Sequence, residues 1–172
     1  MKRFHALAGL AVTVAACTST PTVVVPDTLK PSAGETAVLT SPARGVQIYE
    51  CRARKDGAGF EWAFVAPEAE LFDAKSRSIG THGAGPTWQA SDGSRIVGSV
   101  KARADAPVSG AVPWLLLNAK STGPAGAFAA VTSIQRINTA GGVAPATPCT
   151  DGLKGTTVRV PYTADYVFYA VR

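Results

Sequence analysis

The sequence predicts an all-β fold, an antiparallel β-sandwich or a jelly-roll-like barrel of about eight strands with little helix. Three observations favour this class. Short runs of β-branched and aromatic residues alternate with a period of two, as in Phe60–Val65, where one face is aromatic. Gly, Pro and Asp-Gly breaks separate these runs. Hardly any segment between the breaks has helical spacing, which disfavours an alternating α/β arrangement.

The amino terminus has the pattern of a secretory signal peptide over residues 1–16. Lys2 and Arg3 precede an apolar run, Ala6–Ala16, which ends in small residues before Cys17. A membrane-spanning helix needs about 20 apolar residues, so this run is too short to span a bilayer. We therefore expect residues 1–16 to be absent from the mature domain.

The stretch that ends at Cys17 resembles the lipobox of bacterial lipoproteins. In that motif the cysteine sulfur receives a diacylglycerol, and cleavage before the cysteine frees its amino group. The resemblance implies that Cys17 is the first mature residue and carries palmitate-type acyl chains, which would anchor the protein to a membrane. Thr18 follows in place of an aspartate, which by resemblance to Gram-negative lipoproteins implies the outer membrane. Plain secretory cleavage after Ala16 is the alternative.

Residues 17–34 form the predicted tether between the anchor and the domain. The segment is rich in Thr, Ser and Pro, a composition that favours an extended, semi-rigid chain. In the alternative reading, Val23–Val25 adds an edge strand, although prolines flank this short run. Residues 35–172 are predicted to form a single β-domain, which is long enough to bury a core.

Most strands of the domain are expected between turn signals. Val46–Arg54 and Phe60–Val65 form a predicted hairpin, joined by the sequence Lys-Asp-Gly-Ala-Gly. Ala66–Ala74 has plausible helical spacing, but at under three turns it would be a marginal helix. Further strands are predicted at Thr87–Ala90, Ser94–Arg103, Trp114–Ala119, Phe128–Asn138, Thr156–Tyr162 and Tyr166–Val171.

The chain has three cysteines, an odd number for a secreted protein. Lipidation of Cys17 leaves Cys51 and Cys149, which are predicted to form a disulfide in an oxidising compartment. The bridge would close a loop of about 100 residues, for which chain-entropy arguments give on the order of 4–5 kcal/mol of stabilisation. Zinc needs at least three protein ligands, and one histidine remains after processing, so neither a metal nor another cofactor is expected.

Several ordered blocks of sequence resemble one known family. They run from about Arg44 to Tyr169 and include VQIYECR, WAFVAPEAELFD, IGTHGAGPTWQASDGS, VPWLLLNAKSTG, VTSIQRINTAGGVAP and PCTDGLKGTTVRVPYTADYVFY. These blocks are similar to those of the domain-of-unknown-function 3455 family of secreted bacterial and fungal proteins. The resemblance covers nearly the whole domain and implies no particular activity.

Charge and motifs exclude several function classes. The chain has 17 Lys and Arg and 12 Asp and Glu, and loss of Lys2 and Arg3 leaves a net charge of +3. The cations are scattered, without a basic run or interleaved aromatics, so a nucleic-acid partner is not expected. No nucleophilic-serine motif is present, and no catalytic residue is assigned. Carboxylates that could act as a glycosidic acid–base pair are Glu68, Glu70, Asp73, Asp92 and Asp165.

Four residues are candidates for a ligand-binding site: His82, Trp88, Gln135 and Arg136. The first two lie in Thr81–Ser94, where glycines and a proline are typical of a chain that reverses direction. We therefore expect a structural loop in which His82 bonds the backbone, with ligand binding as a second role. For Arg136 two readings stay open, an outward-facing charge and a buried ion-pair partner.

Together these patterns predict a cell-envelope lipoprotein. Its β-domain is expected to be non-catalytic, with a structural role or with a small molecule, a glycan or a partner as its ligand. The lipid anchor is expected to attach the protein to the membrane. The alternative is an envelope hydrolase that acts on a glycan or an ester. A hydrolase needs a cleft in which titratable groups converge on one point, whereas a binding module needs only an aromatic-lined hollow.

Overall fold

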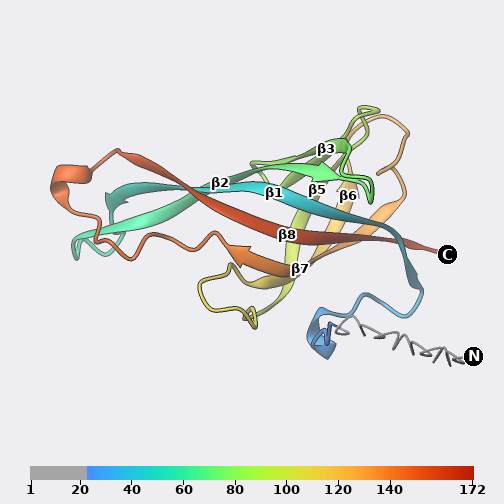
Figure 1. Cartoon of the computed structure of the whole chain (residues 1–172), viewed down its shortest axis with the longest axis horizontal. Coiled ribbons are helices and arrows are strands. Elements are labelled where there is room, and N and C mark those ends of the chain that lie inside the picture. Colours follow the sequence, from blue (N-terminus) through green and yellow to red (C-terminus); the bar gives the residue numbers. More distant parts are fainter. Residues whose placement is uncertain (1–22) are drawn as a thin grey trace, which may run out of the picture.

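A computed structural model describes residues 23–172, which form a closed barrel of eight antiparallel strands. Each strand pairs with the next along the chain, and β8 pairs with β1 to close the barrel (Figure 1). The elements are η1 (Asp27–Leu29), β1 (Glu35–Ala53), β2 (Phe60–Phe72), β3 (Ser78–Gly83), β4 (Thr87–Ala90), β5 (Arg95–Ala104), β6 (Trp114–Ser121), β7 (Val131–Gly141), η2 (Asp151–Leu153) and β8 (Thr157–Val171).

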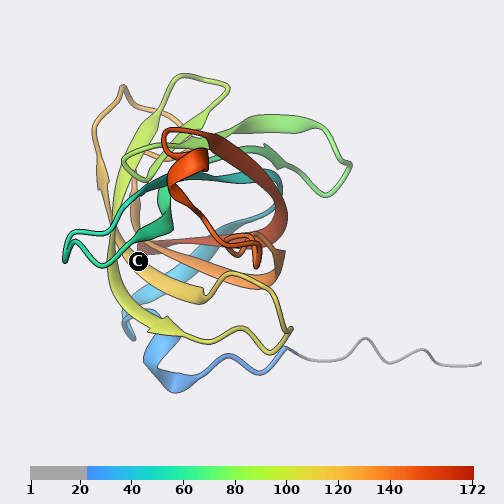
Figure 2. The same ribbon diagram turned by 90° about the vertical axis from the view of Figure 1, so that its left-hand side faces the viewer.

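The predicted all-β class is confirmed, and the architecture is a barrel whose strands follow chain order. Sequential pairing explains why the short Gly- and Pro-rich turns suffice as connections. β1 and β8 are the longest strands and extend together toward η2 (Figure 1). Viewed from that end, the strands surround a common axis (Figure 2). Closure leaves neither β1 nor β8 as a free edge.

The helix predicted at Ala66–Ala74 is wrong, because β2 runs through Phe72 as a strand. Ala69 and Leu71 are buried while Glu68 and Glu70 are exposed, which is the period of two that a strand requires. A helix of under three turns is marginal alone. Pairing with β1 from Phe60 to Leu71, interrupted only at Val65, therefore decides the conformation.

Other strand boundaries also differ from the prediction. The two strands expected at Thr156–Tyr162 and Tyr166–Val171 are one continuous strand, β8, and β1 begins at Glu35 instead of Val46. β3 (Ser78–Gly83) is an additional strand. Both long strands gain their extra residues by pairing with each other, an interaction between opposite ends of the domain that local patterns do not reveal.

The main core fills the interior of the barrel with large side chains. Aromatic rings pack against one another there, with the ring centroids of Phe128 and Phe168 4.7 Å apart. The largest members of this cluster are Leu71, Trp88, Ile96, Leu117, Phe128, Ile134, Tyr162, Tyr166 and Phe168.

A second apolar cluster lies on the outer side of the barrel wall, formed by Leu29, Trp114, Leu116, Ile137 and Val167. β6 carries a continuous apolar run because both its faces are covered: Leu117 faces the main core and Leu116 the outer cluster. The outer cover is η1, whose Leu29 is fully buried.

The prediction that residues 17–34 form a tether outside the core is therefore wrong for the part around Leu29. In addition to the burial of its side chain, the carbonyl of Leu29 accepts a hydrogen bond from Gln135 Nε2 at 2.7 Å. Val23–Val25 form no strand. The Pro-rich composition is that of a tether, but an isolated leucine can bury wherever the folded barrel presents an apolar wall.

The predicted disulfide between Cys51 and Cys149 is confirmed, with Cα atoms 5.5 Å apart. It joins the end of β1 to the segment before η2, and Cys51 also exchanges backbone hydrogen bonds with Gly155 and Thr156. The bridge therefore holds the β7–β8 connection against the far end of β1.

The signal peptide, Cys17 and the first residues of the predicted tether lie outside the described residues. Within residues 23–172, no helix is both long and apolar enough to cross a membrane. In the same part of the chain, no three His, Cys, Asp or Glu side chains gather in a way that could hold a metal ion.

Candidate functional site

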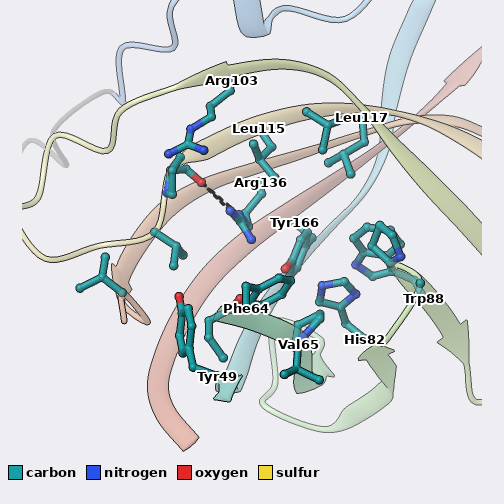
Figure 3. Close-up of a pocket in the computed structure, with 18 of the residues that line it drawn as sticks. Tyr49, Phe64, Val65, His82, Trp88, Arg103, Leu115, Leu117, Arg136 and Tyr166 are labelled. Carbon is teal, nitrogen blue, oxygen red and sulfur yellow. Dashed lines mark hydrogen bonds between the residues drawn. The ribbon is translucent and has the colours of Figure 1, made fainter. Parts of the chain in front are cut away.

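A cavity of about 700 Å³ lies at one end of the barrel interior (Figure 3). Most of its lining is apolar or aromatic, and the polar exceptions are few. The apolar and aromatic lining includes Phe64, Val65, Pro67, Pro86, Trp88, Val100, Val112, Leu115, Leu117 and Val143. Side chains with polar groups come from Gln47, Tyr49, His82, Arg103, Arg136 and Tyr166.

His82 of β3 forms one wall of the cavity together with Trp88, its cross-strand partner on β4. The two rings stack with centroids 4.2 Å apart and planes 12° apart, and the ring of Tyr166 lies edge-on to His82 at 5.1 Å. The turn between the two strands includes Gly85 at a φ of 88°, a conformation that suits glycine. The predicted chain reversal is confirmed here.

The imidazole of His82 is neutral in the folded protein. Its Nδ1 lies 2.8 Å from the carbonyl oxygen of Thr87. Because a carbonyl can only accept, Nδ1 carries the proton and Nε2 keeps its lone pair. Burial lowers the pKa of His82 to about 4; the Thr87 bond opposes this shift, whereas the charge of Arg136 adds to it. The expected bond from His82 to the backbone is thus present, in a side chain that also faces the cavity.

Tyrosine hydroxyls and one amide make up most of the uncharged polar lining. Tyr49 Oη donates to the carbonyl of Gly142 at 2.7 Å. The hydroxyl of Tyr166 lies 3.3 Å from that of Tyr162, a core residue that is not part of the lining. Burial raises the pKa of all three phenols, so they are neutral hydrogen-bonding groups near pH 7. The amide Nε2 of Gln47 is buried and has no hydrogen-bond partner among the described residues, a deficit that a bound ligand could correct.

Arg136 faces the cavity from β7, half-buried beside Tyr166. Its Nε and Nη2 both donate to the carbonyl of Pro113, at 3.1 and 2.8 Å (Figure 3). Neither reading proposed from the sequence is correct, because the side chain points inward and no carboxylate pairs with it in residues 23–172. The backbone carbonyl orients the guanidinium and leaves other N–H groups free to bind.

Arg103 of β5 reaches the cavity because of a β-bulge. Register shifts between Val100 and Ala102, so the inward positions of β5 change from even to odd residue numbers. Val100 and Arg103 consequently both line the cavity, while Ala102 packs on the outer cluster. Without the bulge, Ala102 would face inward in place of the arginine.

The mouth of the cavity has an apolar rim. Phe64, Val65, Val100 and Val143 all line the cavity and yet are 41–59% exposed. A second bulge, in β2 opposite Ile48 and Tyr49, leaves Val65 unpaired so that both Phe64 and Val65 reach the rim. Apolar groups gathered at an opening are typical of ligand-binding clefts.

The structure brings together His82, Trp88 and Arg136 of the predicted site residues and separates Gln135 from them. The Gln135 side chain lies on the opposite face of β7, where Nε2 donates to Leu29 and Oε1 accepts from Tyr169. Neighbouring residues of a strand face opposite ways, so Gln135 and Arg136 cannot both face the cavity. Gln135 is therefore a structural residue that fixes η1 to the wall.

Sequence reasoning missed Gln47, Tyr49, Arg103 and Tyr166 of the cavity lining. For Gln47 and Tyr49 a signal was present, since they alternate with a cysteine, Cys51, that was predicted to be bridged and therefore buried. For Arg103 the same alternation is misleading, because the bulge reverses it.

The carboxylates considered as an acid–base pair all lie outside the cavity lining. Asp73 and Glu68 pair with Arg77 and Arg159, and Asp165 accepts from Asn138 Nδ2. Asp92 accepts from Ser94 and from the backbone of Ala127, which ties the β4–β5 turn to a neighbouring loop. These roles are local and structural.

Comparison with known proteins identifies a family. The family model described as "Protein of unknown function (DUF3455)" matches residues 31–170. This range includes all eight strands except Val171, the last residue of β8, and every residue named in the cavity. No curated protein and no solved structure matches the chain. Because the match spans most of the sequence, the chain belongs to this family of proteins of unknown function, DUF3455.

Proposed function

We propose that this domain binds a small, largely apolar molecule in the cavity of its barrel. The observation that carries the proposal is the cavity itself, whose volume of about 700 Å³ falls within the range of roughly 300–1,000 Å³ common for small-molecule sites. Eight-stranded barrels are wide enough either to fill with side chains or to hold one small ligand. Here the core side chains leave part of the interior open.

The walls of this cavity support binding because they are already ordered. Trp88 is buried against Gly98, where even a β-carbon would come within 2.8 Å of the indole ring. The stacked His82 and the edge-on Tyr166 hold the indole from other sides. A ligand that enters would therefore lose little free energy to rearrangement of the walls.

The test uses the fluorescence of phenylnaphthylamine, a neutral apolar probe that brightens when it leaves water. We expect the wild-type domain to bind it at one saturable site. In Ala144→Trp an indole is added at a residue that lines the cavity, and binding should weaken by about ten-fold or more because the ligand loses its space.

Ala146→Trp is the matched control, since Ala146 lies two residues further along the same loop, is exposed and does not line the cavity. It should bind the probe as the wild type does, at an unchanged melting temperature. Equal binding by both tryptophan variants, or no saturable binding by the wild type, would remove the support for a ligand in the barrel.

We also propose that the domain is held at the cell envelope by a lipid on Cys17. The lipobox-like sequence before that cysteine supports this placement. The Cys51–Cys149 disulfide supports export to an oxidising compartment. The anchored domain would then present its cavity to molecules of the envelope, and the mass of the mature protein tests the anchor.

A further inference from the structure

We infer that the ligand is an organic anion, an amphiphile whose acid group binds Arg136 and Arg103 and whose apolar body fills the rest of the cavity. This inference rests on the proposed function and adds the chemical class of the ligand. The acid group is a carboxylate, sulfonate or phosphate ester, since each offers the oxygen atoms that guanidinium groups bind.

The strand register places the two arginines in one row across the barrel wall. Arg103 of β5 is opposite Leu115 of β6, Leu115 is opposite Arg136 of β7, and Arg136 is opposite Tyr166 of β8. Neighbouring strands lie about 4.8 Å apart, so the backbones of the two arginines are about 10 Å apart with one leucine between them. Side chains as long as arginine can converge on one anion across that distance.

Within residues 23–172, neither arginine has a counter-charge. In the described part of the chain the ion pairs are Lys30–Asp27, Arg54–Glu61, Arg77–Asp73 and Arg159–Glu68. No Asp or Glu among these described residues lines the cavity. Two like charges on one wall of a cavity repel each other. An anion bound between them would remove this cost.

The guanidinium of Arg136 is oriented before any ligand arrives. The Pro113 carbonyl accepts from Nε and Nη2 and so fixes the plane of the group, while the donors that remain are available to an acid group. The amide Nε2 of Gln47, buried and unpartnered in the same lining, is a further donor for a polar ligand.

The opposite side of the cavity suits an apolar body. Figure 3 shows Arg103 and Arg136 on one side and the His82–Trp88 stack on the other, with Tyr166 between them. His82 carries no charge there because its pKa is lowered to about 4. The cavity therefore has a cationic end and an uncharged aromatic end, which is the complement of an amphiphilic anion.

The experiment compares two fluorescent probes with the same aromatic body. Anilinonaphthalene sulfonate carries a sulfonate, and phenylnaphthylamine lacks it. We expect the wild-type domain to bind the sulfonate at least about ten times more tightly, because a charge-assisted hydrogen bond to a guanidinium is worth that much or more. Ala144→Trp should weaken both probes, which places both in the cavity.

Variants at the arginines then assign the preference. Arg136→Met should weaken sulfonate binding about ten- to hundred-fold and phenylnaphthylamine binding much less, so that the ratio of the two affinities falls. Arg103→Glu, at an exposed position of the lining, should also weaken sulfonate binding more than binding of the neutral probe. Arg95→Gln is the control, since Arg95 is exposed on the same strand and does not line the cavity, and it should change neither affinity.

The outcomes separate the two proposals. If both probes bind equally and neither Arg136→Met nor Arg103→Glu changes the ratio, the ligand is not selected for negative charge and the present inference fails while the cavity proposal stands. If neither probe responds to Ala144→Trp, the cavity proposal fails first. Should Arg136→Met not fold, Arg103→Glu alone decides, because a sulfonate affinity unaffected by reversal of that charge contradicts the inference.

Discussion

At the scale of the residue, His82 shows how burial changes the role of a side chain. An isolated histidine in a glycine-rich stretch suggests a loop, and its ring does bond the backbone of Thr87. The same ring stacks on Trp88 and is almost fully buried. Burial penalises the protonated form, so the pKa falls from 6.5 to about 4. His82 is therefore a neutral wall of the cavity at physiological pH.

This depressed pKa predicts a pH dependence of stability. Between the unfolded pKa near 6.5 and the folded pKa near 4, the unfolded chain binds more protons, so stability falls as the pH falls through that window. From pH 7.5 to pH 4.5 the free energy of unfolding should drop by about 2–3 kcal/mol on account of His82. Urea unfolding at a series of pH values measures the drop.

The matched variant for this measurement is His82→Phe, which keeps an aromatic ring and cannot take up a proton. The carboxyl groups of Glu35, Asp73 and Asp92 have pKa values lowered mainly by hydrogen bonds, so they also cost stability in acid. They contribute equally in both proteins, so the difference between wild type and variant isolates His82. Parallel curves for the two proteins would show that His82 takes up its proton without cost.

At the scale of the element, η1 is the segment whose observed role differs most from the role predicted from the sequence. A three-residue helix on a Pro-rich segment has few internal hydrogen bonds. It is ordered by Leu29, which enters the cluster formed by Trp114, Leu116 and their neighbours on the outer wall. The segment before β1 therefore covers the wall whose inner face carries Arg103 and Arg136.

Leu29→Ala should destabilise the domain by about 2–5 kcal/mol, because it removes a fully buried side chain and leaves a cavity. Val24→Ala is the control, since Val24 is 84% exposed and should change stability by less than about 0.5 kcal/mol. Urea unfolding measures both changes: if the dependence of the free energy of unfolding on urea concentration is unchanged, the shift of the midpoint gives the change in stability. If Leu29→Ala is as stable as Val24→Ala, the segment is a tether after all and its packing contributes nothing.

At the scale of the whole molecule, two long-range connections hold the domain together. Pairing of β1 with β8 closes the barrel, and the disulfide joins residues that are 98 positions apart in the chain. Both link the start of the domain to its end, so the barrel forms only when most of the chain is present. The cavity depends on this closure because all eight strands contribute to its lining.

The mature protein should carry a diacylglycerol on Cys17 and contain no free thiol. Intact-mass measurement of detergent-extracted protein, with and without a thiol-alkylating reagent, tests both features together. Cys17→Ser should lose the lipid mass and become soluble without detergent, with the disulfide unchanged. An unmodified Cys17 would favour plain secretory cleavage after Ala16, and two reactive thiols at Cys51 and Cys149 in exported protein would contradict the bridge.

The sequence by itself determined the strand content, most turns and the disulfide of this protein. Alternation in Phe60–Val65 and the glycines near His82 act over a few residues, where local conformation follows local chemistry. The pairing of the two cysteines followed from their number once Cys17 was assigned to the lipid. These features need no knowledge of which strands become neighbours.

Only the tertiary structure decided which side chains meet in the cavity. A bulge of one residue in β5 turns Arg103 inward, and alternation along β7 sends Gln135 outward while Arg136 faces in. Barrel closure extends β1 and β8 beyond their local signals and builds the outer wall that buries Leu29. The physical reason is that a one-residue change of register reverses the face of every later side chain in a strand, and register is set by pairing between distant segments.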